Sequence, residues 1–318
     1  MQWLGFRRRL EYIAFRTLIG VAYVMPVWMQ RAVAWSFAVL LCHVLPKKLT
    51  RYEVASDNIR HAFGEECSDD KIDQMIFGMW QHLVRLVIEV VQFPRFVRLE
   101  NMYNIVEFRN KNDVVKALCS GRPVIMLGGH FGNWETSVAA FGEFGFPMGI
   151  VARPLDNPLL DEWFRKFREH TGHVMIDKKG GGPKMVERLQ NGQHLALLGD
   201  QDAGRKGVFV DFFGRPASTF KSIALLALQH DAIICVGYAV RLPDGNHNSE
   251  WVKYELGCEE VVDSRDFTSA SAIPELTQRY SAALERAIRR APEQYFWVHR
   301  RWKSQPISKA ERQQRRAA

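Results

Sequence analysis

The sequence predicts an α/β fold, in which a largely parallel central sheet is flanked by helices and preceded by an N-terminal apolar helical segment that anchors the chain to a membrane. Two observations predict it. From about residue 113 short apolar runs alternate with helical patterns, and before residue 46 the chain contains two long apolar stretches. With 318 residues, 47% hydrophobic and 25% charged, the chain is large enough to bury a full core.

The alternating part predicts the sheet. Five short apolar runs are predicted as strands, at residues 123–127, 146–152, 173–176, 194–199 and 232–240. Helices are expected between them, at about 130–140, from 157 onward, at 183–191 and at 219–229, with a last helix at about 273–290. Strands that alternate with helices are typical of a parallel sheet, in which reactive groups gather where strands end and helices begin.

A long helix is predicted before the sheet. Ser68 is a suitable N-cap, apolar residues recur every three to four positions after it, and Pro94 is expected to end the helix. We therefore divide the chain into four parts. These are membrane-associating helices (1–50), a helical segment that packs on the core (51–105), the α/β domain (106–303) and a basic polar tail (304–318).

The two N-terminal apolar stretches, residues 17–30 and 32–45, are separated by Arg31. Each is 14 residues long, or about 21 Å as a helix, whereas the hydrocarbon core of a bilayer is about 30 Å thick. Pro26 also disfavours one straight helix. A tilted span that tolerates Arg31, a re-entrant pair and a pair in the interface all remain open, as does a buried soluble hairpin. We favour a shallow pair, with the rest of the chain in the cytosol.

The distribution of charge favours a membrane over nucleic acid. The net charge is +8, yet residues 1–51 carry +7 and residues 286–318 carry +8, so the part between them is acidic. A nucleic-acid-binding protein usually carries its basic surface on the folded domain. Basic ends instead suit an anionic membrane, where each Lys or Arg contributes about 1 kcal/mol. Ordinary solvated tails are the alternative.

A histidine directly follows the first predicted strand. His130 lies in a glycine-flanked turn, and Glu135 lies in the first turn of the next helix. Within one regular helix the two would point about 140° apart, but from the turn the imidazole is within reach of the carboxylate. A carboxylate so placed fixes the imidazole tautomer, while the other ring nitrogen takes a proton from a hydroxyl. We expect His130 to be a general base with Glu135 as its partner, although such pairs also occur by chance.

Six segments form an ordered set of motifs along the chain. They are residues 51–63, 129–135, 153–161 with the arginines that follow, 200–202, 207–214 and 297–303. In sequence and order they resemble the lipid A late acyltransferases, a branch of the lysophospholipid acyltransferase superfamily, and the resemblance covers nearly the whole chain. Residues 200–202, Asp-Gln-Asp, differ from the Glu-Gly block of the glycerolipid branch and so favour the saccharolipid branch.

The resemblance implies the activity and its main residues. The donor would be acyl-acyl carrier protein, and the acceptor would be a hydroxyl of a lipid A precursor, an anionic lipid. His130, Glu135, Arg168 and Asp200 would form the catalytic set. The enzyme would lie at the bacterial inner membrane with its active site facing the cytoplasm, and would require neither a metal nor a cofactor.

A second set of residues is expected to bind substrate. Arginines suit bidentate contacts to phosphate, or else form surface ion pairs, and the phenylalanines would wall an acyl groove or belong to the core. The set comprises Arg153, Asn157, Arg165, Gln201, Asp202, Phe212 and Phe213. Two other functions remain open: an acyltransferase for a lysophospholipid or another glycolipid, and a non-catalytic membrane-binding protein.

Overall fold

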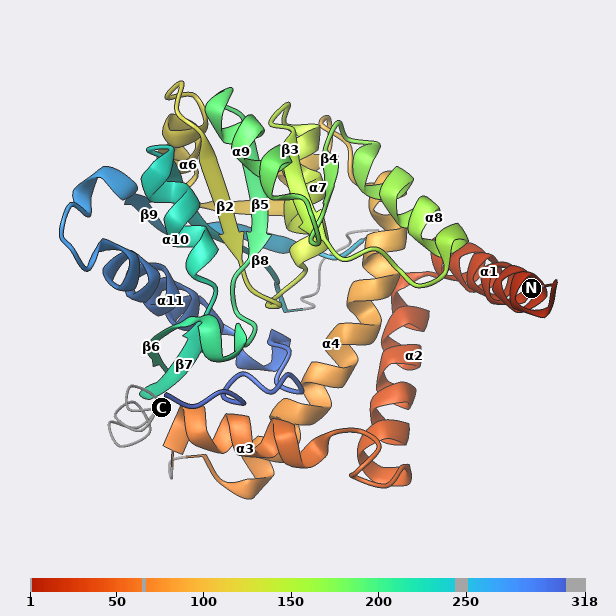
Figure 1. Ribbon diagram of the computed structural model, residues 1–318. Helices are drawn as coiled ribbons and strands as arrows, with labels where there is room; N and C mark the ends of the chain where they lie inside the picture. The colour runs from red at the N-terminus through yellow and green to blue at the C-terminus, as the bar shows by residue number, and fades with distance from the viewer. Residues whose placement is uncertain (1, 65–66, 244–250, 307–318) are drawn as a thin grey trace.

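A seven-stranded sheet forms the centre of the computed structural model, which describes residues 2–64, 67–243 and 251–306 (Figure 1). The strand order is β1-β9-β8-β2-β5-β3-β4. Within the described sheet only β8 and β9 pair antiparallel, and the other neighbouring strands are parallel. The bounds are β1 Val106–Arg109, β2 Val124–Gly128, β3 Met148–Ala152, β4 Val174–Asp177, β5 His194–Leu198, β8 Ile233–Arg241 and β9 Tyr254–Asp263. The predicted α/β fold with a largely parallel sheet is confirmed.

The five predicted strands are β2, β3, β4, β5 and β8, with ends within two residues of those expected. Two further strands, the edge strand β1 and its neighbour β9, were not predicted. Nor was the separate hairpin of β6 (Val208–Phe212) and β7 (Arg215–Thr219), which takes up the start of the helix expected at 219–229. That helix begins only at Lys221.

Helices cover both faces of the sheet. On one face α6 (Lys111–Leu118) and α7 (Trp134–Glu143) share an apolar cluster with β2, β5 and β8. On the other face a larger cluster contains α9 (Gly182–Gln190), α10 (Lys221–Gln229) and α11 (Ala272–Arg290). The remaining elements of the domain are α5 (Met102–Ile105), α8 (Pro158–Glu169) and the short 3₁₀ turns η3 (Gly204–Lys206), η4 (Ser264–Asp266) and η5 (Pro292–Gln294).

The long helix α4 (Asp69–Phe96) crosses the molecule beside α3 (Tyr52–Phe63) and α2 (Figure 1). Ser68 caps it as predicted, since its side chain accepts a hydrogen bond from the backbone nitrogen of Lys71. The prediction that it ends before Pro94 was wrong. A proline in the last turn removes only one backbone hydrogen bond, and the next turn still closes through Val97 N–H to Phe93 C=O.

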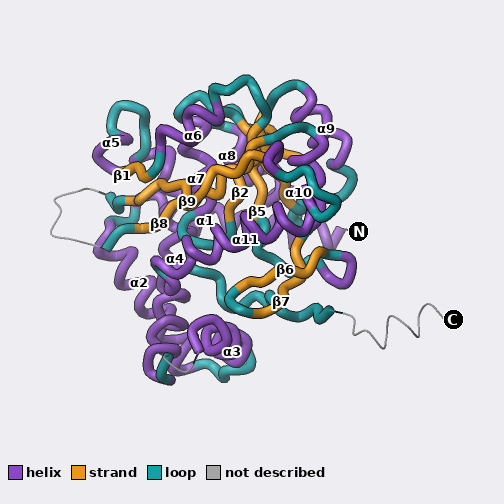
Figure 2. The backbone as a smooth tube through the Cα atoms, turned by 90° about the vertical axis from the view of Figure 1, so that its left-hand side faces the viewer, coloured by secondary structure: helices purple, strands orange, loops and turns teal. Residues whose placement is uncertain are grey.

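The N-terminal segment consists of α1 (Gln2–Val24) and α2 (Val27–Val39), which continues as a π-helical turn, η1 (Leu40–Val44). The break between the two helices falls at Pro26, the residue that was expected to disfavour one straight helix, whereas Arg31 lies inside α2. Residues 27–44 form one helix that is long and apolar enough, by length and composition only, to cross a membrane. Figure 2 shows α2 beside α4, away from the sheet. Of the predicted polar tail, residues 307–318 lie outside the described part of the chain.

Candidate active site

The turn between β2 and α7 carries the predicted base. It begins after Gly128 and passes through His130 to Asn133, whose side chain caps α7 by accepting from Thr136 N–H. Gly132 has a φ of +59°, and a Cβ there would lie 2.1 Å from the carbonyl oxygen of Ala239. Only glycine therefore allows the turn to pack this closely against β8.

Asp200 holds the imidazole of His130. The Nδ1 atom lies 2.8 Å from one carboxylate oxygen, and the backbone N–H of His130 donates to the other at 2.7 Å. Because a carboxylate only accepts, Nδ1 carries the hydrogen in the neutral ring, and Nε2 is left with its lone pair. The Nε2 atom lies 3.3 Å from the side-chain nitrogen of Gln201. Asp200 thus fixes the orientation of the ring and leaves Nε2 as the nitrogen that can accept a proton.

Burial and charge act in opposite directions on this pair. Burial disfavours the charged imidazole, but the charge of Asp200 and its hydrogen bond outweigh burial, so the pKa of His130 is raised. Burial likewise opposes the charged form of Asp200, yet the contacts from His130 lower the pKa of this carboxyl group. Asp200 is only 3% exposed. The aspartate thus remains charged and stabilises the imidazolium that would form during proton transfer.

Glu135 and Arg168 form a second pair beside the turn. Two nitrogens of Arg168, in the last turn of α8, donate to the two carboxylate oxygens of Glu135 at 2.7 and 3.0 Å. Burial lowers the pKa of Arg168, but the hydrogen bonds that it donates to Glu135 and the charge of that carboxylate outweigh burial, so the pKa is raised. The structure therefore brings the four expected catalytic residues together, but Asp200 occupies the place at the imidazole that the sequence suggested for Glu135. Glu135 acts on His130 only through its charge, which also raises the imidazole pKa.

The expected substrate-binding residues are spread more widely. Arg153 is exposed and pairs with Asp156, and Arg165 pairs with Asp161 and Asp177. The remaining five form other contacts. Asn157 caps α8 and donates to Glu11 and to the backbone carbonyl of Arg8 on α1. Asp202 accepts hydrogen bonds from Gly204 and Ser304, and the side chain of Gln201 lies within hydrogen-bond distance of His130. Phe212 and Phe213 belong to the main core. Of these seven, only Gln201 touches His130.

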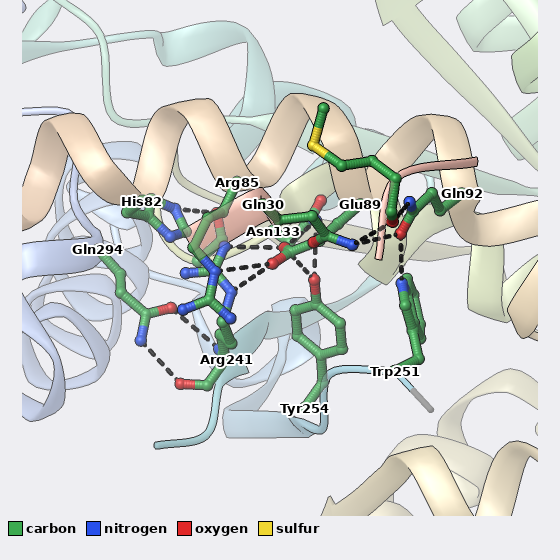
Figure 3. Close-up of polar contacts among 12 residues, drawn as sticks. Gln30, His82, Arg85, Glu89, Gln92, Asn133, Arg241, Trp251, Tyr254 and Gln294 are labelled. Carbon is green, nitrogen blue, oxygen red and sulfur yellow. Dashed lines mark hydrogen bonds and ion pairs between the residues drawn. The ribbon is translucent and has the colours of Figure 1, made fainter. Parts of the chain in front are cut away.

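A buried polar network behind the turn was missed by sequence analysis. Figure 3 shows Asn133, Arg241 and Tyr254 converging on Glu89 of α4. Arg241 donates to both carboxylate oxygens of Glu89 at 2.6 and 2.8 Å, and Tyr254 and Asn133 donate to one of them. Glu89 is fully buried. Its position on the apolar stripe of α4 was the available signal, because a charged residue on a buried helix face requires a partner.

Two further contacts fix the backbone of the same turn. The His82 ring nitrogen Nε2 lies 3.1 Å from the Gly132 carbonyl oxygen, and the Gly132 N–H donates to the backbone carbonyl of Gln294. The Gln294 side chain in turn bonds both backbone groups of Arg241. The turn is therefore held from α4, from β8 and from the segment after α11.

An apolar cavity of about 110 Å³ lies between α7 and the sheet. Small residues on three neighbouring strands, Gly128, Ala196 and Gly237, leave this space open. Glu135 and Arg168 line it, as do Gly129 and Phe131 on either side of His130 in the chain, whereas Phe212 and Phe213 do not. The cavity therefore begins at the turn that carries His130 and extends under α7. We name it the inner cavity.

Fold and site together define an α/β protein with a histidine–carboxylate pair beside a buried apolar cavity. The chain belongs to the bacterial lipid A biosynthesis acyltransferase family, whose model matches residues 7–304. It is accordingly an O-acyltransferase.

Three relatives illustrate the range of similarity. A lipid A biosynthesis acyltransferase of Haemophilus influenzae is 23% identical over 93% of this chain and 85% of its own length. A lipid A biosynthesis lauroyltransferase of Escherichia coli is 30% identical over 58% of each chain. A phosphatidylinositol mannoside acyltransferase of Mycolicibacterium smegmatis is 30% identical over 37% of this chain and 40% of its own.

Proposed function

We propose that the enzyme transfers a fatty acyl group from acyl-acyl carrier protein to a hydroxyl of a lipid A precursor. The observation that carries the proposal is the His130–Asp200 pair, which leaves the Nε2 of His130 available next to an apolar cavity. Two relatives that match most of this chain are a lipid A biosynthesis acyltransferase and a lipid A biosynthesis palmitoleoyltransferase, which supports this acceptor.

The chemistry follows from this geometry. The Nε2 atom of His130 takes the proton of the acceptor hydroxyl as its oxygen attacks the thioester carbon. The new C–O bond forms, the C–S bond breaks, and the imidazolium returns its proton to the departing thiolate, giving an ester and a free thiol. Asp200 stabilises the imidazolium through Nδ1 at each step, which is the function of the buried acid in a histidine–acid pair.

The inner cavity is suited to the acyl chain. Most of its lining is apolar, and each methylene moved from water into it contributes about 0.8 kcal/mol. Its polar end carries Glu135 and Arg168, so the chain enters where charged groups can hold the polar atoms of either substrate. We assign Arg168 to a phosphate or carbonyl oxygen of the substrates, because a guanidinium binds planar oxygen pairs in a fixed geometry.

The exposed apolar side chains of the N-terminal helices support association with a membrane. Large apolar side chains are exposed on α1, α2 and η1, and on a soluble surface such a set would favour aggregation. The exposed set comprises Phe6, Leu10, Ile13, Leu18, Val21, Val24, Trp28, Trp35, Phe37, Leu40 and Val44. We infer a position at the bacterial inner membrane with the site facing the cytoplasm, where an acyl carrier protein would reach it.

Mass spectrometry of the product tests the proposal. Purified wild-type protein, acyl-acyl carrier protein and a lipid A precursor should give a lipid heavier by one acyl group. His130→Ala should lower the rate by about 10²–10⁴-fold, the usual loss of a general base, with unchanged thermal unfolding. A stably folded His130→Ala protein of near wild-type activity would exclude His130 as the base.

A second candidate is acylation of another glycolipid. The similarity to phosphatidylinositol mannoside acyltransferases favours it, although that similarity covers only 37% of this chain. The same assay with a mannosylated phospholipid distinguishes the two. Acylation of that lipid, with none of the lipid A precursor, would favour the second candidate.

A further inference from the structure

A second apolar cavity lies farther under the same face of the sheet. It has a volume of about 230 Å³ and is lined by residues of α5, α6, α7, β1, β2 and β9, including Phe108, Phe144 and Phe146. Its lining is otherwise largely apolar, with Arg109 and Lys111 as its two charged residues. We name it the outer cavity.

Met126 and Phe141 separate the two cavities. Both residues line the inner cavity and the outer cavity, and no other described residue lines both. Met126 lies in the middle of β2, and its methyl group is close enough to Gly237 of β8 that a Cβ there would be 3.2 Å away. Phe141 reaches the same place from α7. We call these two shared residues the partition.

The partition stands at a fixed depth from the reacting atoms. Trp134, Val138 and Phe141 follow one face of α7 at helical spacing and all line the inner cavity. Seven residues of helix, from Trp134 at the turn to Phe141, correspond to about 10 Å. A linear chain that begins at the catalytic turn and runs under α7 therefore meets the partition end-on.

We propose that Met126 and Phe141 set the length of the acyl chain that the enzyme transfers. This inference rests on the proposed function, in which the inner cavity holds the acyl chain. A chain that ends at the partition is fully buried, whereas each further methylene must displace one of the two side chains. Methionine is flexible and adapts to its neighbours, so the limit is graded rather than absolute.

Removing the partition joins the cavities and should lengthen the preferred chain. The experiment measures kcat/KM for one acceptor with a series of saturated acyl thioesters of increasing length. Burial of each additional methylene is worth about fourfold. For Met126→Ala and Phe141→Ala we expect a maximum shifted to longer chains, with the longest donors gaining about tenfold or more relative to the wild-type optimum.

Matched variants test the inference from both directions. Phe144→Ala, which enlarges only the outer cavity, should leave the chain-length profile unchanged. Met126→Phe, which extends the partition into the inner cavity, should shift the maximum to shorter chains. This variant and the milder Phe141→Leu keep the inference testable if the alanine variants do not fold.

The outcomes separate this inference from the proposed function. A wild-type protein that transfers no acyl group from any thioester would contradict the proposed function. Normal transfer by all the folded variants, with the wild-type length profile, would overturn the inference alone. An equal shift in Phe144→Ala would also overturn it, because the length limit would then lie beyond the partition.

Discussion

The two sides of the catalytic turn hold their carboxylates in different ways. On the β5 side Asp200 is buried and contacts the imidazole through Nδ1. On the α8 side Glu135 is partly exposed, lines the inner cavity and is bonded to Arg168. The buried Asp200 is therefore suited to orienting the imidazole, whereas Glu135, together with Arg168, is suited to contacting the substrate.

The largest expected effect comes from the β5 side. Asp200→Asn removes the charge that stabilises the imidazolium, and we expect a loss of about 10²–10⁴-fold in kcat, similar to loss of the base itself. Steady-state kinetics of acyl transfer, with circular dichroism as a folding control, measure it. If the folded variant kept nearly full activity, the orienting role of Asp200 would be wrong.

The network behind the turn should affect stability as well as rate. Glu89→Ala removes the buried carboxylate that pairs with Arg241, and breaking such a pair typically costs about 3–5 kcal/mol of unfolding free energy. Urea denaturation measures the loss. Glu89→Gln keeps the shape and should recover part of it. A loss under 1 kcal/mol in Glu89→Ala would show that this network does not hold the turn.

The α8 side should affect acceptor use. In the proposed function Arg168 also contacts a substrate oxygen, and losing one such charge-assisted hydrogen bond costs about 1.5–3 kcal/mol, or about 10–150-fold in kcat/KM for the acceptor. Lysine cannot reproduce the planar guanidinium, which is held in place by two bonds to Glu135. Dephosphorylated acceptors should react poorly with the wild type. Equal losses for donor and acceptor in Arg168→Lys, with no effect of dephosphorylation, would mean that the arginine is structural.

The smallest expected effect belongs to Glu135→Gln. An amide still accepts from Arg168, but bonds to a charged acceptor are roughly twice as strong, so about 1 kcal/mol or fivefold in rate is expected. The comparison with Asp200→Asn is the informative result. If Glu135→Gln were the more damaging of the two, the functions of the two carboxylates would have to be exchanged.

Much of the fold was predictable because it depends on local patterns. The alternation of apolar runs and helices predicted the sheet, and the glycines around His130 predicted the turn. The contact between His130 and Asp200 could not be derived from spacing. The chain forms β3 and β4 before β5, yet in the sheet β5 lies between β2 and β3. The ends of β2 and β5 are therefore neighbours, which brings together two residues that are 70 positions apart in the sequence. The family resemblance named Asp200, but not its contact.

Other features depended on tertiary packing and were predicted less well. Pro94 did not end α4. For Phe212 and Phe213 the sequence left an acyl groove and the core open, and both residues pack in the core. Glu89 gave a signal that was overlooked, since a single acid on a buried helix face implies a partner elsewhere in the chain. The inner cavity had no sequence signal, because glycines and an alanine leave space only when their strands become neighbours.

The pH dependence of kcat/KM for acyl transfer tests most directly whether Asp200 supports His130 as the base. In the wild type the rate should rise with pH through the pKa of His130, which the charge of Asp200 raises above its ordinary value of 6.5. Without that charge, the lowering of the pKa by burial is opposed mainly by the smaller effect of the Glu135 charge, so in Asp200→Asn this limb should move to lower pH while the maximum rate falls. Glu135→Gln should move it less. A limb that stays in place in Asp200→Asn and moves in Glu135→Gln would contradict the account.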